Sequence, residues 1–368
     1  MCVKSAYIHI PFCEQICSYC DFCKLLYNEN LVNKYLEKLK DEIISEYKGE
    51  KLKTIYIGGG TPSSLTILQL NKLFDIIDIF NKDKIYELTI ECNIENTTKE
   101  KIDLFKQRGV NRLSFGIEST DKKQLNFLNR TLNKKHTKDI IDYAKKIGIN
   151  NINVDLIYAL PKQTIDNLKE DLDFILDLGI KHISTYSLII EEHTLLSIKN
   201  IKNISQDLDY EMYEFICSYL KKHNFNHYEI SNFSQIGYES KHNLVYWNNL
   251  EYYGFGLGAS SYINNKRYSN TRSYTKYIKN FNAKEIEQLT KKDTIEYEII
   301  LNLRTHKGIS KENFYKRFNK PIESCYNYQK LITEKLIEEK ENYIYIPEDK
   351  WYISNQIIVH FLEGEKYE

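Results

Sequence analysis

The chain of 368 residues lacks any excess of charge, because 51 Lys and Arg residues balance 51 Asp and Glu residues. Proteins that bind nucleic acids usually carry a basic excess, so this balance argues against a nucleic-acid partner. The chain also lacks apolar runs approaching the roughly 20 residues that a membrane-spanning helix needs. Its first residues, Met1–Ser5, contain no long apolar segment like that of a secretory signal. We therefore expect a cytoplasmic protein with no integral membrane segment.

Cysteine is scarce as well, since the chain has only eight, too few for a disulfide scaffold at this length. Four of the eight lie within one stretch of eleven residues, at Cys13, Cys17, Cys20 and Cys23. In a cytosolic chain, one tight group of cysteines indicates a metal site rather than disulfides.

Short β-rich runs alternate with longer amphipathic helical runs along the first half of the chain. The six expected strands are Ser5–Ile10, Thr54–Ile57, Glu87–Glu91, Arg112–Phe115, Asn151–Leu156 and His182–Tyr186. The helices expected between them are Leu31–Tyr47, Leu65–Phe80, Lys99–Gln107, Thr137–Ile147 and Ile165–Leu178. This order predicts an α/β fold with a parallel sheet, either open and doubly wound or barrel-like. In both architectures, functional groups gather at the C-terminal ends of the strands.

The regular alternation of strands and helices ends after Tyr186, and a long helix is expected over Gln206–Lys222. Near the C-terminus we expect a series of helical segments followed by a hairpin. The helices are Thr294–Arg304, Lys311–Phe318 and Cys325–Lys335, and the hairpin lies near Tyr343–Ile346 and Trp351–Ile353. This order resembles a winged-helix module. We therefore expect a core over residues 1–200, an extension over 201–289 and a small α+β winged-helix-like domain over 290–368.

Three of the clustered cysteines, Cys13, Cys17 and Cys20, have the spacing C-x₃-C-x₂-C directly after the first expected strand. Thiolates select iron–sulfur clusters, zinc or copper over hard cations. Three thiolates can hold three irons of a cubane cluster and leave the fourth iron open to a small molecule. Two alternatives remain. Cys17, Cys20 and Cys23 form part of a ferredoxin-like run, although no Cys-Pro completes it, and all four thiolates could hold zinc.

The spacing and its context resemble the radical S-adenosylmethionine (SAM) superfamily. The segments Tyr7–Cys13 and Tyr19–Phe22 are similar to one branch of it, the oxygen-independent coproporphyrinogen III oxidase-like family. The resemblance implies a partial (β/α)6 TIM-like barrel with SAM as a cofactor. It also implies a [4Fe-4S] cluster whose ligands are Cys13, Cys17 and Cys20. Cys23 is then a spare thiol with a structural role.

Further motifs of this family follow the later strands. Gly58–Pro62 resembles the loop that contacts SAM, Gly109–Ser119 resembles GVNRxSxGxQS, and the segment from Asp155 to Pro161 resembles DLIYGLP. Glu118 stands where the family usually has Gln. Carboxylates can accept hydrogen bonds from the ammonium and hydroxyl groups of SAM, and an Arg can bind its carboxylate. The resemblance implies a cofactor pocket formed by Tyr7, Tyr19, Gly59, Gly60, Thr61, Glu91, Glu118, Arg130 and Asp155.

A third motif, His242–Trp247, resembles an HNxxYW sequence linked to heme in the heme-chaperone branch of the family. Imidazole is a common axial ligand of heme iron, so His242 is a candidate heme contact. The alternative is a histidine that is hydrogen-bonded within the structure beside aromatic rings.

Two features favour a heme chaperone over an oxidase. Phe22 stands where the oxidases have a further cysteine, and no long extension precedes Tyr7, as it does in those enzymes. We therefore expect a protein that binds heme and transfers it to an acceptor protein, with an electron donor for its cluster. The alternatives are an oxygen-independent coproporphyrinogen III oxidase and a closed-site electron-transfer or zinc protein.

Overall fold

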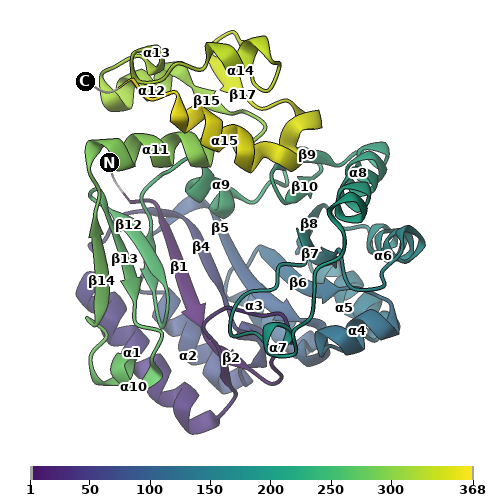
Figure 1. The fold of residues 1–368 in the computed structure, drawn as a ribbon. Coiled ribbons are helices and arrows are strands. Elements are labelled where there is room, and N and C mark those ends of the chain that lie inside the picture. Colours follow the sequence, from purple (N-terminus) through teal and green to yellow (C-terminus); the bar gives the residue numbers. More distant parts are fainter. Residues whose placement is uncertain (1–2, 367–368) are drawn as a thin grey trace.

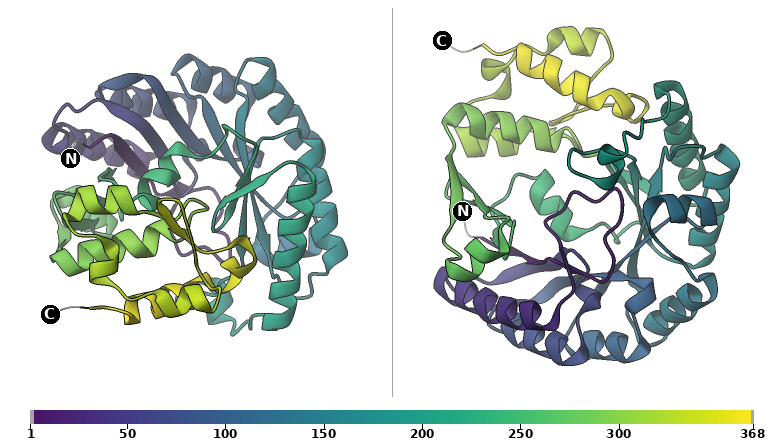
Figure 2. Two further views of the ribbon diagram at one scale, coloured as in Figure 1. Left: turned by 90° about the horizontal axis from the view of Figure 1, so that it is seen from above. Right: turned by 60° about the horizontal axis from the view of Figure 1, so that its bottom comes forward.

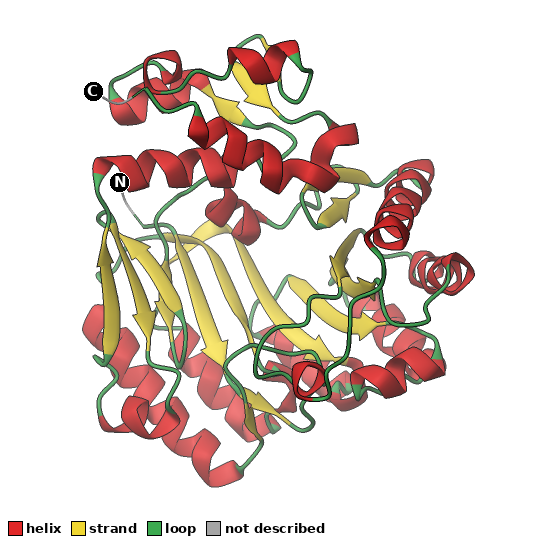
Figure 3. Cartoon of the chain, in the orientation of Figure 1, coloured by secondary structure: helices red, strands yellow, loops and turns green. Residues whose placement is uncertain are grey.

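A nine-stranded sheet dominates the computed structural model, which describes residues 3–366. Its order is β11-β1-β4-β5-β6-β7-β8-β10-β9, and the strands from β11 to β8 run parallel. The parallel strands are β11 (Tyr253–Phe255), β1 (Ser5–Ile10), β4 (Leu52–Gly59), β5 (Lys82–Asn93), β6 (Arg112–Glu118), β7 (Asn151–Tyr158) and β8 (His182–Ser187). The sheet curves without closing, so it forms a partial barrel with its helices outside (Figures 1 and 3). All six predicted strands are confirmed.

The outer helices follow the predicted order. They are α1 (Glu29–Glu46), α2 (Ile67–Ile77), α3 (Lys99–Gln107), α4 (Lys122–Leu128), α5 (Lys134–Lys146) and α6 (Ile165–Asp177). Helix α4 was not expected, and the side chain of Asp121 starts it by accepting hydrogen bonds from the N–H groups of Lys123 and Gln124. No helix in residues 3–366 is long and apolar enough to cross a membrane.

The central strands have one apolar face and one polar face, and the polar face determines where a cavity forms. On β6 the apolar Leu113, Phe115 and Ile117 are buried in the core, on the side of the outer helices. The intervening residues, Arg112, Ser114, Gly116 and Glu118, line a cavity on the concave side. Since side chains alternate along a strand, the polar half of each strand faces the interior of the barrel.

Strand β11 extends the sheet beyond the first predicted strand. Tyr253–Phe255 pairs in parallel with Ala6–Ile8 of β1. A Cβ atom on Gly254 would lie 1.9 Å from the carbonyl oxygen of Ser260, so only glycine fits this strand. Gly254 therefore lies in an edge strand of the barrel. Strands β9 (Asn226–Glu229) and β10 (Asn232–Ser234) form the opposite edge and run antiparallel.

The remaining elements before residue 290 connect or flank this sheet. The two strands of the cysteine loop are β2 (Phe12–Cys13) and β3 (Leu25–Leu26). The helices are α7 (Leu195–Ile198), α8 (Gln206–Lys222), α9 (Lys241–Trp247) and α10 (Tyr274–Lys279). A second sheet contains β12 (Ser260–Ile263), β13 (Lys266–Asn270) and β14 (Lys284–Gln288). Helix α8 has the predicted bounds.

The C-terminal segment packs over the end of the barrel where the strands begin (Figures 1 and 2). Its helices are α11 (Lys291–Asn302), α12 (Lys311–Phe318), α13 (Ile322–Cys325), α14 (Gln329–Thr333) and α15 (Ser354–Glu363). Its small sheet contains β15 (Ile309–Ser310), β17 (Tyr343–Tyr345) and β16 (Glu338–Lys340). In chain order, α11 is followed by the short strand β15, then by three helices, the strand pair β16 and β17, and α15.

Two details of this segment differ from the prediction. The expected helix over Cys325–Lys335 is broken, because Tyr326 is extended and bridges to Glu365. The expected strand over Trp351–Ile353 is a 3-10 turn instead, and the hairpin is formed by β16 and β17. The indole N–H of buried Trp351 donates to the carbonyl of Ile346, which folds the chain back on itself before it can pair.

Candidate functional site

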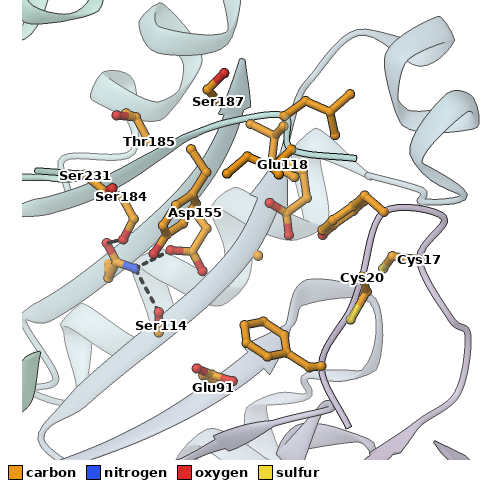
Figure 4. Close-up of a pocket in the computed structure, with 18 of the residues that line it drawn as sticks. Cys17, Cys20, Glu91, Ser114, Glu118, Asp155, Ser184, Thr185, Ser187 and Ser231 are labelled. Carbon is orange, nitrogen blue, oxygen red and sulfur yellow. Dashed lines mark hydrogen bonds between the residues drawn. The ribbon is translucent and has the colours of Figure 1, made fainter. Parts of the chain in front are cut away.

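One cavity of about 720 Å³ occupies the interior of the partial barrel. It brings together the three cysteines of the C-x₃-C-x₂-C motif and most of the predicted cofactor residues. Its lining includes Cys13, Cys17, Cys20, Tyr19, Gly59, Gly60, Thr61, Glu91, Glu118, Arg130 and Asp155. Figure 4 shows Cys17 and Cys20 around the same space as Glu91, Glu118 and Asp155. Most of these residues come from the loop after β1 and from the ends of β4 to β7, where parallel sheets collect functional groups, and Arg130 follows α4.

Two of the three thiols, those of Cys13 and Cys17, contact polar side chains. Thr61 Oγ1 lies 3.6 Å from Cys13 Sγ, and Arg130 Nη1 lies 3.7 Å from Cys17 Sγ. Burial raises the pKa of the Cys13 thiol to about 11, and the nearby Cys20 and Cys17 add to the shift. Within residues 3–366, no three His, Cys, Asp or Glu side chains converge closely enough for a single metal ion. A cubane cluster binds each thiolate through a different iron, so this donor set fits a cluster better than one zinc ion.

Cys23 belongs to a different environment. Its Sγ lies 3.6 Å from the carbonyl oxygen of Arg272, and its own carbonyl oxygen lies 2.7 Å from His9 Nε2. It is not part of the cavity lining. Cys23 thus lies apart from the three thiols at the cavity, and its structural role stays a prediction.

The glycine loop after β4 fixes one of the acidic groups. The backbone N–H of Gly59 and the hydroxyl of Tyr56 each donate to the carboxyl group of Glu91, at 2.8 Å. Gly59 has a φ of 115°, and an added Cβ would lie 2.4 Å from the ring of His9, so glycine is required here. Because the carboxyl is enclosed by protein, desolvation raises the pKa of Glu91 to about 7 despite both hydrogen bonds.

Glu118, Arg130 and Asp155 form the rest of the polar wall. Arg130 donates to the Asn93 side chain at 3.0 Å and to the Gly116 carbonyl at 2.6 Å, while its buried Nε has no partner. Glu118 adopts a φ of 67°, which is unusual for this residue type. Burial raises the pKa of Glu118 to about 7, although the charge of Arg130 opposes the shift. Desolvation also raises the pKa of Asp155.

Three carboxyl groups that form no ion pair within residues 3–366 thus share one cavity with two arginines, each of which has a buried Nε without a partner. Such a wall stabilises a ligand that carries positive charge, hydroxyl groups and one carboxylate. The residues present therefore fit SAM, and the three thiols beside them fit an iron–sulfur cluster.

The raised pKa of Glu91 predicts a pH-dependent stability. The native state keeps the proton of Glu91 up to about pH 7, whereas the unfolded state releases it near its ordinary pKa of 4.5. The native state therefore binds more protons between these pH values, and stability falls as the pH rises through them. Because solvent in the cavity screens part of this effect, we expect the free energy of unfolding to fall by about 2 kcal/mol over this pH range.

Denaturant unfolding of the protein and of Glu91→Gln at pH 5 and pH 7.5 tests this. We expect the free energy of unfolding of the variant to fall less between the two values. Glu37→Gln, on the exposed side of α1, is the matched control. Equal pH dependence in all three proteins would contradict the prediction.

The structure does not place two of the predicted cofactor residues at the cavity. Tyr7 lies behind it, since its ring stacks on Tyr56 at 6.1 Å between centroids. His242 is 1% exposed, with Nδ1 at 2.8 Å from Thr54 Oγ1 and Nε2 at 2.7 Å from Tyr246 Oη. Both ring nitrogens thus have hydrogen-bond partners within the protein, as in the structural alternative left open by the sequence, and heme binding by His242 stays a prediction.

The motif around His242 has a clear role in the fold. The carboxylate of Glu87 accepts hydrogen bonds from the N–H groups of Lys241 and His242 at the start of α9. Helix α9 packs against β4 and closes the end of the barrel where the strands begin (Figure 1). Of this motif, Asn243 lines the cavity.

The sequence analysis missed several lining residues. On the inner strand faces they are Arg112, Ser114, Asn153 and Ser184, and on the far wall they are Tyr213, Trp351 and Tyr352. The alternation of polar or small residues with apolar ones along Arg112–Glu118 could have indicated the first group. No local pattern indicates the second group, because its position depends on how α8 and the C-terminal segment pack.

Family models match two parts of this chain. Residues 7–175 match the Radical SAM superfamily, and residues 289–349 match the HemN C-terminal domain. The solved structure of coproporphyrinogen III oxidase (HemN) from Escherichia coli, titled a radical SAM enzyme, covers 98% of this chain and 90% of its own. It has a TM-score of 0.85 at 20% sequence identity, which shows a common fold. The fold and the site thus define a member of the radical SAM superfamily, and this implies a [4Fe-4S] cluster and SAM as cofactors.

Relatives of similar length narrow the assignment. Heme chaperone HemW of Lactococcus lactis is 39% identical, over 98% of this chain and 97% of its own. Heme chaperone HemW of Bacillus subtilis is 38% identical, over 98% of this chain and 99% of its own. The chain therefore belongs to the HemW family.

Proposed function

We propose that this protein is a heme chaperone, which binds heme and passes it to an acceptor protein. The observation that carries the proposal is the near-full-length identity to two relatives named heme chaperones. In this proposal Cys13, Cys17 and Cys20 hold a [4Fe-4S] cluster, and an electron donor serves that cluster. SAM lies against Gly59–Thr61, Glu91, Glu118, Arg130 and Asp155. Bound together, cluster and SAM supply redox chemistry next to the heme site.

The far wall of the cavity supports heme as the ligand. It is mainly apolar and aromatic, and it is formed by Ile157, Tyr158, Tyr186, Leu188, Ile189, Tyr213, Ile230, Trp351 and Tyr352. Ile189 is 65% exposed and Tyr186 is 44% exposed, so apolar surface continues to the rim. Aromatic and aliphatic side chains of this kind pack well against the faces of a porphyrin.

This wall also suggests how the parts of the chain work together. We propose that residues 1–200 hold the cluster and SAM, and that residues 201–289 close the barrel with α9. Residues 290–368 then complete the aromatic wall through Trp351 and Tyr352. A ligand held between these parts contacts both the barrel and the C-terminal segment.

A chaperone is favoured over an oxidase at one position of the cysteine loop. Phe22 lies on the cavity lining and is 68% exposed. A thiol at this position would be the fourth thiol of the loop to line the cavity, and phenylalanine supplies apolar surface instead.

The test uses full-length protein reconstituted with iron and sulfide under anaerobic conditions. We expect saturable heme binding in an absorbance titration, and no protoporphyrinogen IX from coproporphyrinogen III with SAM and a reductant. Absence of heme binding would contradict the proposal. Robust SAM-dependent formation of protoporphyrinogen IX would replace it with the oxidase.

A further inference from the structure

Arg112 lies on the inner face of β6, and within residues 3–366 its guanidinium has no hydrogen bond or ion pair. Its side chain lines the cavity and is only 2% exposed. Its Nε is fully buried without a hydrogen-bond partner. Among residues 3–366, no carboxylate oxygen lies within 4.0 Å of its guanidinium, and no protein acceptor is found for it. Arg130, the other arginine of the cavity, differs because it donates to Asn93 and Gly116.

The polar groups around Arg112 are already engaged with one another. Asn153 donates to Ser114 Oγ and to the Asp155 carboxyl, each at 2.8 Å (Figure 4). His182 Nδ1 lies 2.6 Å from Asn153 Oδ1, and its Nε2 lies 2.7 Å from Tyr228 Oη. None of these polar groups is hydrogen-bonded to the guanidinium. Burial raises the pKa of Asp155 and Glu91 in the same cavity, and the charge of Arg112 opposes the shift in both, without an ion pair to either. A buried guanidinium without a partner is costly, so its presence indicates an anionic group supplied from outside the chain.

Arg112 and Arg130 lie at different depths in the cavity. Arg130 binds the Gly116 carbonyl and lies next to Cys17. Arg112 precedes Gly116 by four residues on β6, which corresponds to about 13 Å along the strand. Arg130 therefore lies at the end of the cavity that holds the cysteine loop. Arg112 lies at the opposite end, which we call the floor, and the lining of the cavity also includes Asn243 of α9.

We infer that Arg112 receives a carboxylate of the bound ligand, and that this carboxylate is a heme propionate. The inference rests on the proposed heme binding. SAM has one carboxylate, for which Arg130 beside the cysteine loop is the proposed partner. A heme against the aromatic wall extends along the cavity and carries propionates that a second arginine can bind in a fork geometry.

The first experiment changes the ligand and leaves the protein intact. The wild-type protein is titrated with ferric heme and with ferric heme dimethyl ester, whose propionates carry no charge. Since hydrogen bonds to charged groups are worth about 1.5–3 kcal/mol, we expect the ester to bind about 10-fold more weakly or worse. Equal affinity for both compounds would overturn the inference, and binding of neither would overturn the proposed function instead.

The second experiment changes the protein. Arg112→Met should lower heme affinity by about 10-fold or more and remove the preference for heme over its ester. Arg112→Lys should restore part of both, and Arg108→Met, at the half-exposed end of α3, should change neither. SAM affinity should stay at the wild-type value in all of them. A loss of SAM affinity with unchanged heme affinity would assign Arg112 to SAM and overturn the inference.

Thermal unfolding separates this role from a structural one. Replacing an unpaired buried charge by an apolar side chain of similar length does not weaken a fold. Ligand-free Arg112→Met should therefore unfold at the same temperature as the wild type or at a higher one. A clear decrease in the unfolding temperature would mean that Arg112 serves the fold, which would also overturn the inference.

Discussion

Replacing Cys17 by Ala should remove nearly all iron from the reconstituted protein, whereas replacing Cys23 by Ala should leave its iron content unchanged. Cys17 lines the cavity together with Cys13 and Cys20, and no fourth thiol of the loop joins them there. A cluster held by three thiolates loses an iron ligand in the Cys17 variant. Changing a mere neighbour of a metal ligand typically costs about 10- to 100-fold in metal affinity, so losing the ligand itself should cost more.

Iron and sulfide analysis after anaerobic reconstitution, with the absorbance of the cluster, measures this effect. Cys23→Ala is a matched control, because it removes a thiol from the same loop. The Cys23 thiol contacts the carbonyl of Arg272 outside the cavity, so its loss should leave the donor set intact. Equal iron loss in the two variants would refute the assignment and favour a site that uses all four thiols.

The architecture could be predicted from the sequence because local signals and the fold agree. The six central strands combine β-rich composition with regular spacing, and α8 and α12 were predicted with the bounds that the structure has. The cysteine loop and the glycine loop were found for a related reason. Their residues lie close together in the chain and directly follow strands, where parallel sheets collect functional groups.

The parts that could not be predicted depend on contacts between distant segments. Trp351 begins the second strand of the predicted hairpin, yet its indole N–H donates to the carbonyl of Ile346, and the segment forms a 3-10 turn instead. His242 has the chemistry of a heme ligand, but Thr54 and Tyr246 occupy its ring nitrogens. Burial also lowers the pKa of His242 to about 3, and the charge of Arg112 adds to the effect. A motif shows which groups are present, and only the packing shows which of them are free.

Arg130 has donor groups that remain free to bind a ligand, so its loss should weaken SAM binding more than that of any other residue considered. Its guanidinium has acceptors on one side, in Asn93 and Gly116, and a buried Nε without a partner. It is therefore fixed in place while retaining donor capacity, which suits a residue that binds the carboxylate of a ligand. Arg130→Ala removes these donors and also the positive charge that opposes the raised pKa of Glu118.

We expect Arg130→Ala to lower SAM affinity by about 100-fold, since truncating one partner of a buried charge pair costs about 2–5 kcal/mol. Equilibrium binding of SAM to the reconstituted protein measures this, with iron content as a second readout. Iron content should fall much less than in Cys17→Ala, because Arg130 donates to Cys17 but supplies no ligand to the cluster. Arg108→Ala, which removes an arginine that pairs with Asp75 and Asp78 on the surface, should change neither quantity. Unchanged SAM affinity with a full cluster would show that the carboxylate binds elsewhere, and Arg112 would then be the next arginine to test.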